Sequence, residues 1–136
     1  MKNKIEYISL RDAKKLIKKN NGKAFIAEIC GNRINTLDDF FKEIYSAFKF
    51  PYNDYGFDQC FDYLTRLDQW IEEEEYVLII YDYDIALSKD VESKKTIMSN
   101  FVDYILVWWE KEIKQYCIDG TPKKFNVFLV APSDGF

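Results

Sequence analysis

The most informative pattern in the chain lies in residues 49–70, KFPYNDYGFDQCFDYLTRLDQW. It begins as a loop that contains Pro51 and Gly56, and it continues into a helix that we expect to run to about Trp70. At about 100° of rotation per residue, one arc of this helix is apolar. Asp58 and Asp62 fall on the opposite arc, with Thr65 beside them. The two acids are therefore predicted to face outward.

This pair of acids is unfavourable for the helix itself. Like charges four residues apart destabilise a helix by roughly 0.2–0.5 kcal/mol, and Lys or Gln at one of the two positions would give an equally polar surface. The pair therefore suggests a use outside the fold. The alternative interpretation is that Asp58 only interacts favourably with the helix N-terminus and that Asp62 is an ordinary solvated acid.

Aromatic residues surround the acids. They make up 18% of the chain, with ten Tyr and eleven Phe, which exceeds the needs of a small core. Tyrosine offers a large contact area at a low entropic cost, so rings in this stretch suit protein recognition. The candidates are Tyr52, Tyr55, Tyr63 and Trp70. A composition bias towards aromatic residues is the alternative explanation.

Charge and composition exclude several classes of function. The net charge of −4 disfavours nucleic-acid binding and suits a basic protein partner. The chain contains no histidine, which excludes Ser-His-Asp and Cys-His catalysis and histidine-based metal sites within one chain. The odd number of cysteines predicts reduced, mostly buried thiols in a cytoplasmic protein, and we expect neither a signal segment nor a membrane span. The cysteines are Cys30, Cys60 and Cys117.

The order of the expected elements indicates an α/β protein. Residues 1–8 form a strand or a tail, and the helix that follows, capped by Ser9, ends at Asn20-Asn21-Gly22. Three apolar runs predict a three-stranded parallel sheet, and two further amphipathic patterns predict helices packed on it. These strands are 24–30, 76–81 and 125–131, and the helices are 37–48, capped by Thr36, and 91–115. Glu72 to Glu75 predict a solvated connection, and a short disordered tail is expected after residue 131.

The central stretch resembles the barstar family of intracellular ribonuclease inhibitors. The shared pattern is Phe50-Pro51, a loop with aromatics and Gly56, then Asp58, three residues, Asp62, one residue and Leu64-Thr65. Upstream, an apolar strand ending in Gly31-Asn32 and a Thr-capped helix also fit, and the resemblance covers 23 to about 131. Two features depart from the family: the loop is one residue shorter between Pro51 and Asp58, and Gln59-Cys60 replaces Ala-Leu.

The resemblance implies a protein inhibitor without a cofactor and without turnover. Its partner would be a basic extracellular or toxin-type ribonuclease, bound in a one-to-one complex. Asp62 would take the position of a substrate phosphate and pair with arginines and a histidine of the enzyme, while Asp58 would accept from the enzyme's basic rim. The rings of the loop would cover the cleft. The domains would be an N-terminal helical extension, 1–22, and a barstar-like domain, 23–136.

Two other functions stay open at this point. The altered spacing before Asp58 would also fit an immunity protein of the same fold directed at a toxin that is not a ribonuclease. A small Mg²⁺-dependent hydrolase could use Asp82 and Asp84, because α/β folds place metal-binding acids after a strand. A phosphotransferase of that type would also need a nearby Ser or Thr and Lys, whereas Ile85-Ala86-Leu87 follow the acids.

Overall fold

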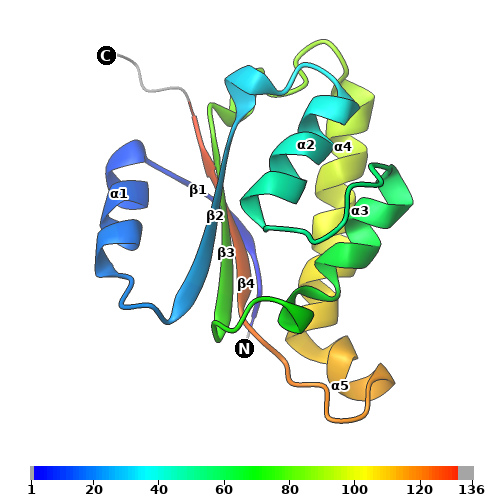
Figure 1. Ribbon diagram of the computed structural model, residues 1–136. Coiled ribbons are helices and arrows are strands. Elements are labelled where there is room, and N and C mark those ends of the chain that lie inside the picture. The colour runs from blue at the N-terminus through cyan, green and yellow to red at the C-terminus, as the bar shows by residue number, and fades with distance from the viewer. Residues whose placement is uncertain (1, 132–136) are drawn as a thin grey trace.

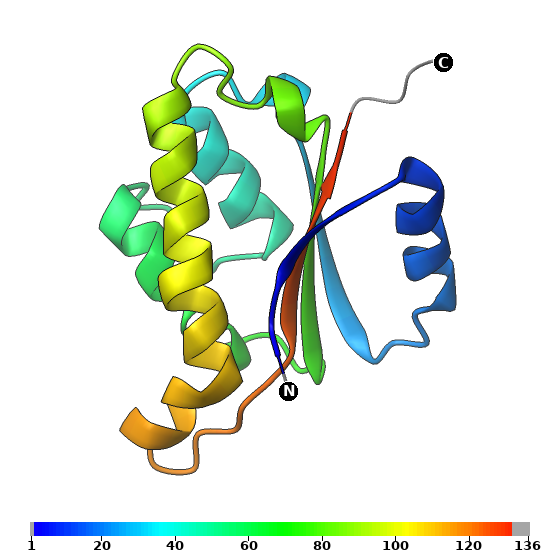
Figure 2. The same ribbon diagram turned by 180° about the vertical axis from the view of Figure 1, so that it is seen from behind.

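A computed structural model describes residues 2–131 of the chain. The protein is an α/β structure built on one sheet of four parallel strands, in the order β1-β4-β3-β2. Figures 1 and 2 show three layers, with α1 on one face of the sheet and the other helices on the opposite face. The expected tail after residue 131 lies outside the described residues.

The sheet has one strand more than the sequence predicted. β3 (Glu75–Tyr81) and β4 (Phe125–Val130) form its centre, where apolar side chains are buried on both faces. β1 (Ile5–Ile8) is the additional strand and pairs with Val127–Val130 of β4. The prediction of three strands is therefore wrong, because four residues with one exposed side chain carry too weak a pattern to separate a strand from a tail.

β2 (Ala24–Cys30) also differs from its prediction. Its apolar run suggested burial on both faces, but β2 is an edge strand with only one neighbour, β3. Glu28 in its middle is exposed, and its carboxylate accepts a hydrogen bond from the Tyr81 hydroxyl at 2.6 Å. At the start of β3, Glu75 is half-buried and lies within the strand, so the solvated connection is shorter than expected.

α2 (Leu37–Ala47) begins where the sequence predicted it. The Thr36 hydroxyl accepts from the Asp39 amide at 3.2 Å, and the Asp39 carboxylate accepts from the Thr36 amide at 3.1 Å. These two bonds form a capping box, which satisfies amides that have no partner inside the helix. The apolar face of α2 is buried against β2 through Phe40, Phe41, Ile44 and Tyr45.

The predicted long helix is also confirmed, and it contains two π-helical turns. It consists of α4 (Val91–Asn100), π turns at Phe101–Ile105 and Trp108–Glu112, and α5 (Ile113–Tyr116). Five of its buried side chains are spaced four residues apart: Ile97, Phe101, Ile105, Trp109 and Ile113. In an ideal α-helix each such step rotates about 40° beyond a full turn. The wider π turns compensate for that rotation and keep all five side chains towards the sheet.

α1 (Leu10–Lys19) covers the opposite face. The Ser9 hydroxyl accepts from the Asp12 amide at 3.0 Å, as its capping role predicted. Ala13 of α1 is fully buried in a second apolar cluster with Val77, Ile79, Phe128 and Val130. The N-terminal segment therefore adds both a strand to the edge of the sheet and a helix to its face.

Only one of the three cysteines is buried. Cys60 is fully buried, and burial raises the pKa of its thiol, whereas Cys30 is half-buried and Cys117 is exposed. All three are free thiols. The expectation of mostly buried cysteines is wrong for Cys117, which lies just beyond the end of the long helix.

Candidate protein-binding site

α3 (Phe57–Leu64) carries the two acids and is shorter than predicted. Its buried face consists of Cys60, Phe61 and Leu64, as the pattern required. The helix does not continue to Trp70, because its last carbonyl groups have other partners. The Thr65 hydroxyl donates to the Asp62 carbonyl at 2.6 Å, and the indole N–H groups of Trp108 and Trp109 donate to the Thr65 and Leu64 carbonyls at 3.1 and 2.8 Å. A short 3-10 turn, Leu67–Gln69, follows.

Both acids of α3 face outward. Asp58 is exposed, and among the described residues its carboxylate has no hydrogen bond or ion pair. The Asp62 side chain is 46% exposed and forms an ion pair with Arg66, with 3.1 Å between Oδ2 and Nη2. Arg66 is itself about half exposed, so this pair is a weak surface contact. Asp62 is therefore accessible to a stronger cationic partner.

Tyr63 organises the aromatic loop that precedes α3. Its ring stacks on Tyr52, with 4.1 Å between centroids and 13° between planes. Its hydroxyl donates to the Asp54 carboxylate at 2.7 Å, while the Tyr45 hydroxyl donates to the Asp54 carbonyl at 2.9 Å. The hydrogen bond to Asp54 raises the pKa of Tyr63 to about 12. Two helices thus hold one loop residue in place.

The other two predicted rings differ in exposure. Tyr55 is 50% exposed and packs on Tyr45, with 4.7 Å between centroids. Trp70 is half-buried, and its indole N–H donates to the Phe48 carbonyl at 2.9 Å, with its ring edge on Phe50. Both loop tyrosines, Tyr52 and Tyr55, are exposed and can contact a partner.

Thr65 lies behind this surface. It is 8% exposed, and its hydroxyl is engaged by the Asp62 carbonyl, so little of the side chain is available to a partner. Sequence reasoning missed three residues that shape the site: Asp54, Tyr45 and Arg66. The spacing of four between Asp62 and Arg66 is an ion-pair signal on a helix, but the contacts of Asp54 depend on how the loop folds back and leave no pattern in the sequence.

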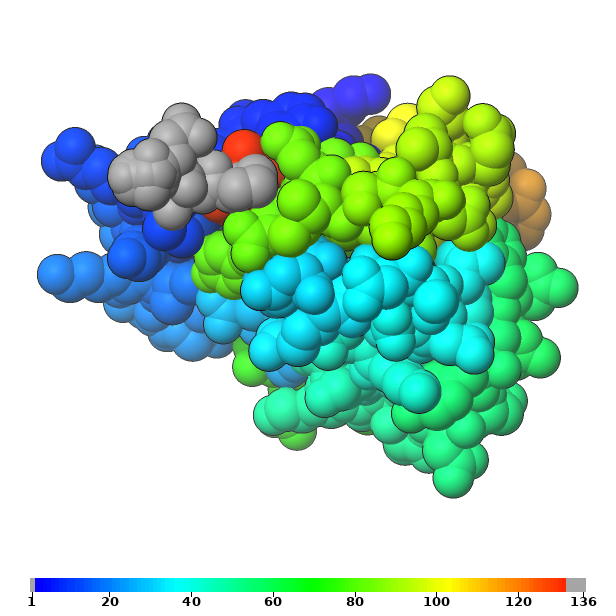
Figure 3. All heavy atoms as spheres, turned by 90° about the horizontal axis from the view of Figure 1, so that it is seen from above, coloured from blue at the N-terminus to red at the C-terminus, as the bar shows by residue number. Residues whose placement is uncertain are grey.

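The acids that follow β3 lie at the carboxyl edge of the sheet. Figure 3 views the molecule from above, where segments 31–36 and 82–90 lie side by side. The Leu87 amide donates to the Ile34 carbonyl at 2.9 Å, and Gly31 lies so close to the Asp82 carbonyl that a Cβ would clash. Lys94 is near, but its ammonium donates to the Tyr83 carbonyl at 2.7 Å. Across residues 2–131 no three His, Cys, Asp or Glu side chains gather in a metal-binding group.

The fold is α/β, and the exposed acids of α3 lie beside the aromatic loop that precedes this helix. Residues 24–120 match the family model Barstar (barnase inhibitor). The chain therefore belongs to the barstar family, an inhibitor family, and the match supports an inhibitor or immunity type of role. β1, α1 and β4 lie outside the matched residues, so the match ends before the last strand of the expected resemblance. A comparison with curated proteins finds no match.

The fold is similar to that of a solved structure. That structure is the Aeropyrum pernix ORC2 protein in ADPNP-ADP complexes, with a TM-score of 0.51 and 12% sequence identity. The alignment covers 96% of this chain and 34% of that one, so the chain spans about a third of its length. At this identity the likeness is one of fold alone. No helix in residues 2–131 is both long enough and apolar enough to cross a membrane.

Proposed function

We propose that this protein is a stoichiometric inhibitor of a basic microbial ribonuclease and works by occluding the active site. The observation that carries the proposal is the pair Asp58 and Asp62, which face outward on α3 in a chain of the barstar family. Two carboxylates suit a cleft whose cationic groups normally hold phosphates. The complex is one to one and requires neither a cofactor nor turnover.

The aromatic loop supplies the second half of the surface. Tyr52 and Tyr55 are exposed rings held on Tyr63 and Tyr45, so their contact area is available at a low entropic cost. Trp70 supports the loop from the side, as its contacts with Tyr52 and Phe50 indicate. In this arrangement the acids provide electrostatic attraction, and the rings exclude water around them.

A titration tests this proposal. The protein is added to a barnase-type ribonuclease while RNA cleavage is followed at low and moderate salt. We expect inhibition that saturates at one equivalent and association that slows with salt. Asp62→Ala is expected to weaken the complex by about 2 kcal/mol or more, the threshold of an interface hot spot, with a much smaller loss of folding stability because the side chain is half exposed.

Glu74→Ala is the matched control, because it removes an exposed carboxylate that lies outside α3 and its aromatic loop, just before β3, and should leave inhibition unchanged. Equal losses in both variants would contradict the assigned surface. If no inhibition is seen at any ratio, the ribonuclease target is wrong, and the shorter loop before Asp58 favours immunity against a different basic toxin. Mg²⁺-dependent thermal stabilisation that is lost in Asp82→Asn would instead support the hydrolase.

A further inference from the structure

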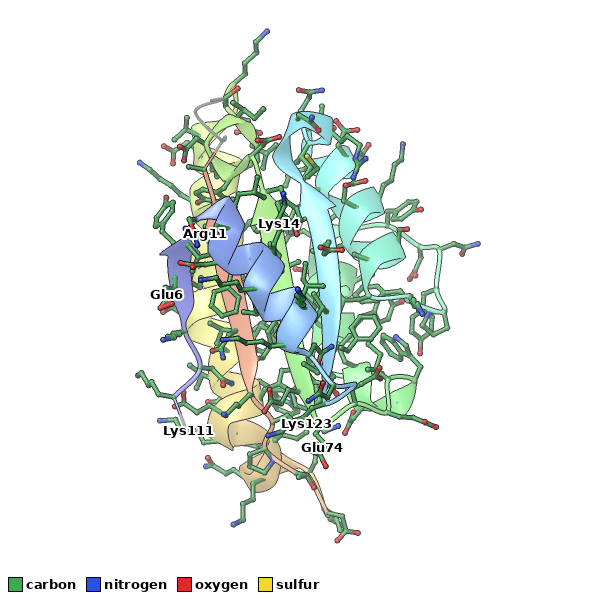
Figure 4. The ribbon with its side chains drawn as sticks, turned by 90° about the vertical axis from the view of Figure 1, so that its left-hand side faces the viewer. Glu6, Arg11, Lys14, Glu74, Lys111 and Lys123 are labelled. Carbon is green, nitrogen blue, oxygen red and sulfur yellow. The ribbon has the colours of Figure 1, made fainter. Side chains whose placement is uncertain are left out.

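A second surface lies on the opposite side of the sheet. A groove of about 610 Å³ runs between α1 and the first residues of β2, β3 and β4. Figure 4 shows that α1 crosses this face of the sheet and covers only part of it. The floor of the groove is apolar and includes Ile26, Val77 and Phe128 of the sheet, with Leu16 of α1 beside them. Of these, Leu16 and Ile26 are only half-buried, so the floor is accessible to an apolar group.

The rim of this groove is basic, although the whole protein is acidic. Four lysines line it: Lys15, Lys19, Lys23 and Lys124. The acids in the lining are Asp12 and Glu75, and the Glu75 carboxylate is already shared by Lys23 at 3.4 Å and Lys124 at 3.9 Å. Within residues 2–131, Lys15 and Lys19 have no ion pair. The groove therefore has an excess of positive charge in a chain of net charge −4.

We propose that this groove binds a segment of a partner protein that is acidic and presents apolar side chains along one side. The lysines select the charge of the partner, and the floor requires apolar side chains, which a small anion cannot supply. A second copy of this chain fits less well, because the groove would have to meet a different surface of that copy. Such a head-to-tail contact does not close into a dimer.

The two surfaces are independent. The groove lies on the α1 side of the sheet, whereas α3 and its aromatic loop lie on the other side (Figure 1). α1, which forms one wall of the groove, is outside the residues that match the barstar family. An acidic partner at the groove and a basic partner at α3 could therefore bind at the same time. This inference does not depend on the proposed ribonuclease target.

The probe for this inference is a synthetic helical peptide with leucines along one face and glutamates on the others. A version with lysines in place of the glutamates has the same shape and the opposite charge. We expect the acidic peptide to bind, to weaken with salt, and to shift the NMR amide signals of Ile26, Val77 and Phe128. The lysine version should leave those signals unchanged.

The double variant Lys15→Glu with Lys19→Glu should weaken binding of the acidic peptide at least about tenfold. The matched control is Lys14→Glu with Lys18→Glu, which makes the same change of charge on the same helix but outside the lining of the groove. The Asp62→Ala variant, which changes α3 on the opposite side of the sheet, should bind the acidic peptide as tightly as the unchanged protein does.

Four results would overturn the inference. The first is that the acidic peptide shifts no NMR signals of the groove, and the second is that both peptides bind equally well. The third is that the two double variants lose the same amount of affinity for the acidic peptide. The fourth is that the signals of the groove shift with protein concentration when no peptide is present. The last would mean that a second copy occupies the groove. None of these readouts involves a ribonuclease. If the groove does not bind the acidic peptide, the proposed inhibition of a ribonuclease is unaffected, and if no ribonuclease is inhibited, the proposed role of the groove is unaffected.

Discussion

At the scale of the residue, the Tyr76 hydroxyl is unusual. Tyr76 is fully buried, and its ring packs against Trp109 and Phe125. Among the side-chain nitrogen and oxygen atoms that are buried in residues 2–131, its hydroxyl oxygen is the one that has no hydrogen-bond partner. Burial raises the pKa of this hydroxyl, which keeps it neutral. A buried hydroxyl without a partner costs about 1–3 kcal/mol. Removing this hydroxyl is therefore expected to increase the stability of the fold.

We expect Tyr76→Phe to raise the free energy of unfolding by about 1 kcal/mol, because it removes an unsatisfied group and keeps the ring. Urea denaturation measures the change. Tyr45→Phe is the control: its hydroxyl donates to the Asp54 carbonyl at 2.9 Å, so the same substitution should lower stability by about 1 kcal/mol. Similar changes in both variants would contradict the assignment of the Tyr76 hydroxyl as unpaired.

Tyr63 makes the stability of the fold depend on pH. Its folded pKa is about 12, above the usual value of 10.0, because the Asp54 carboxylate accepts its proton in a hydrogen bond. Below pH 10 the Tyr63 hydroxyl keeps its proton in both the folded and the unfolded chain, so its hydrogen bond to Asp54 contributes fully to the stability of the fold. Between pH 10 and 12 only the unfolded chain releases it, so stability falls as the pH rises. We expect Tyr63→Phe to make this fall less steep, measured by urea denaturation at pH 9, 10 and 11. An unchanged slope would show that the buried tyrosines, Tyr45 and Tyr76, account for the fall in stability.

At the scale of the element, the two helix starts and the long helix could be predicted from the sequence, whereas the end of α3 could not. Capping residues act locally, so Ser9 and Thr36 mark their helices in the sequence. The end of α3 depends on the indole N–H groups of Trp108 and Trp109, more than forty residues away along the chain. The prediction of a regular helix did not include the π turns, although the spacing of four among the buried residues of the long helix is a signal for them.

The capping box of α2 yields a prediction with an internal control. Thr36→Ala removes the hydroxyl that accepts from the Asp39 amide and should lower the free energy of unfolding by about 1 kcal/mol. Thr96→Ala makes the same change on an exposed turn of α4, where alanine is the better helix former, and should raise stability by a few tenths of a kcal/mol. Thermal unfolding monitored by circular dichroism distinguishes the two. Changes of the same sign would mean that the cap contributes little.

At the scale of the whole molecule, the N-terminal segment is held by a buried residue that the sequence did not mark. The side-chain Nδ2 of Asn3 donates to the Leu106 carbonyl at 3.0 Å and to the Lys123 carbonyl at 3.2 Å. The side-chain Oδ1 accepts from the backbone amide of Phe125 at 3.0 Å. One side chain thus joins the start of the chain, the long helix and β4. An asparagine in a polar segment such as MKNK looks like solvated surface, because its partners lie more than a hundred residues away.

This junction decides whether the molecule has three strands or four. Asn3→Ala removes three hydrogen bonds, two to backbone carbonyls and one from a backbone amide, and each buried group left without a partner costs about 1–3 kcal/mol. We expect a loss of at least about 2 kcal/mol in urea denaturation and faster hydrogen exchange at Val127, whose amide donates to the Lys4 carbonyl at 3.0 Å. Lys2→Ala, an exposed neighbour, should change neither quantity. If neither variant is destabilised, β1 is dispensable for folding. If only Asn3→Ala is destabilised, β1 unfolds together with the rest of the sheet as one cooperative unit.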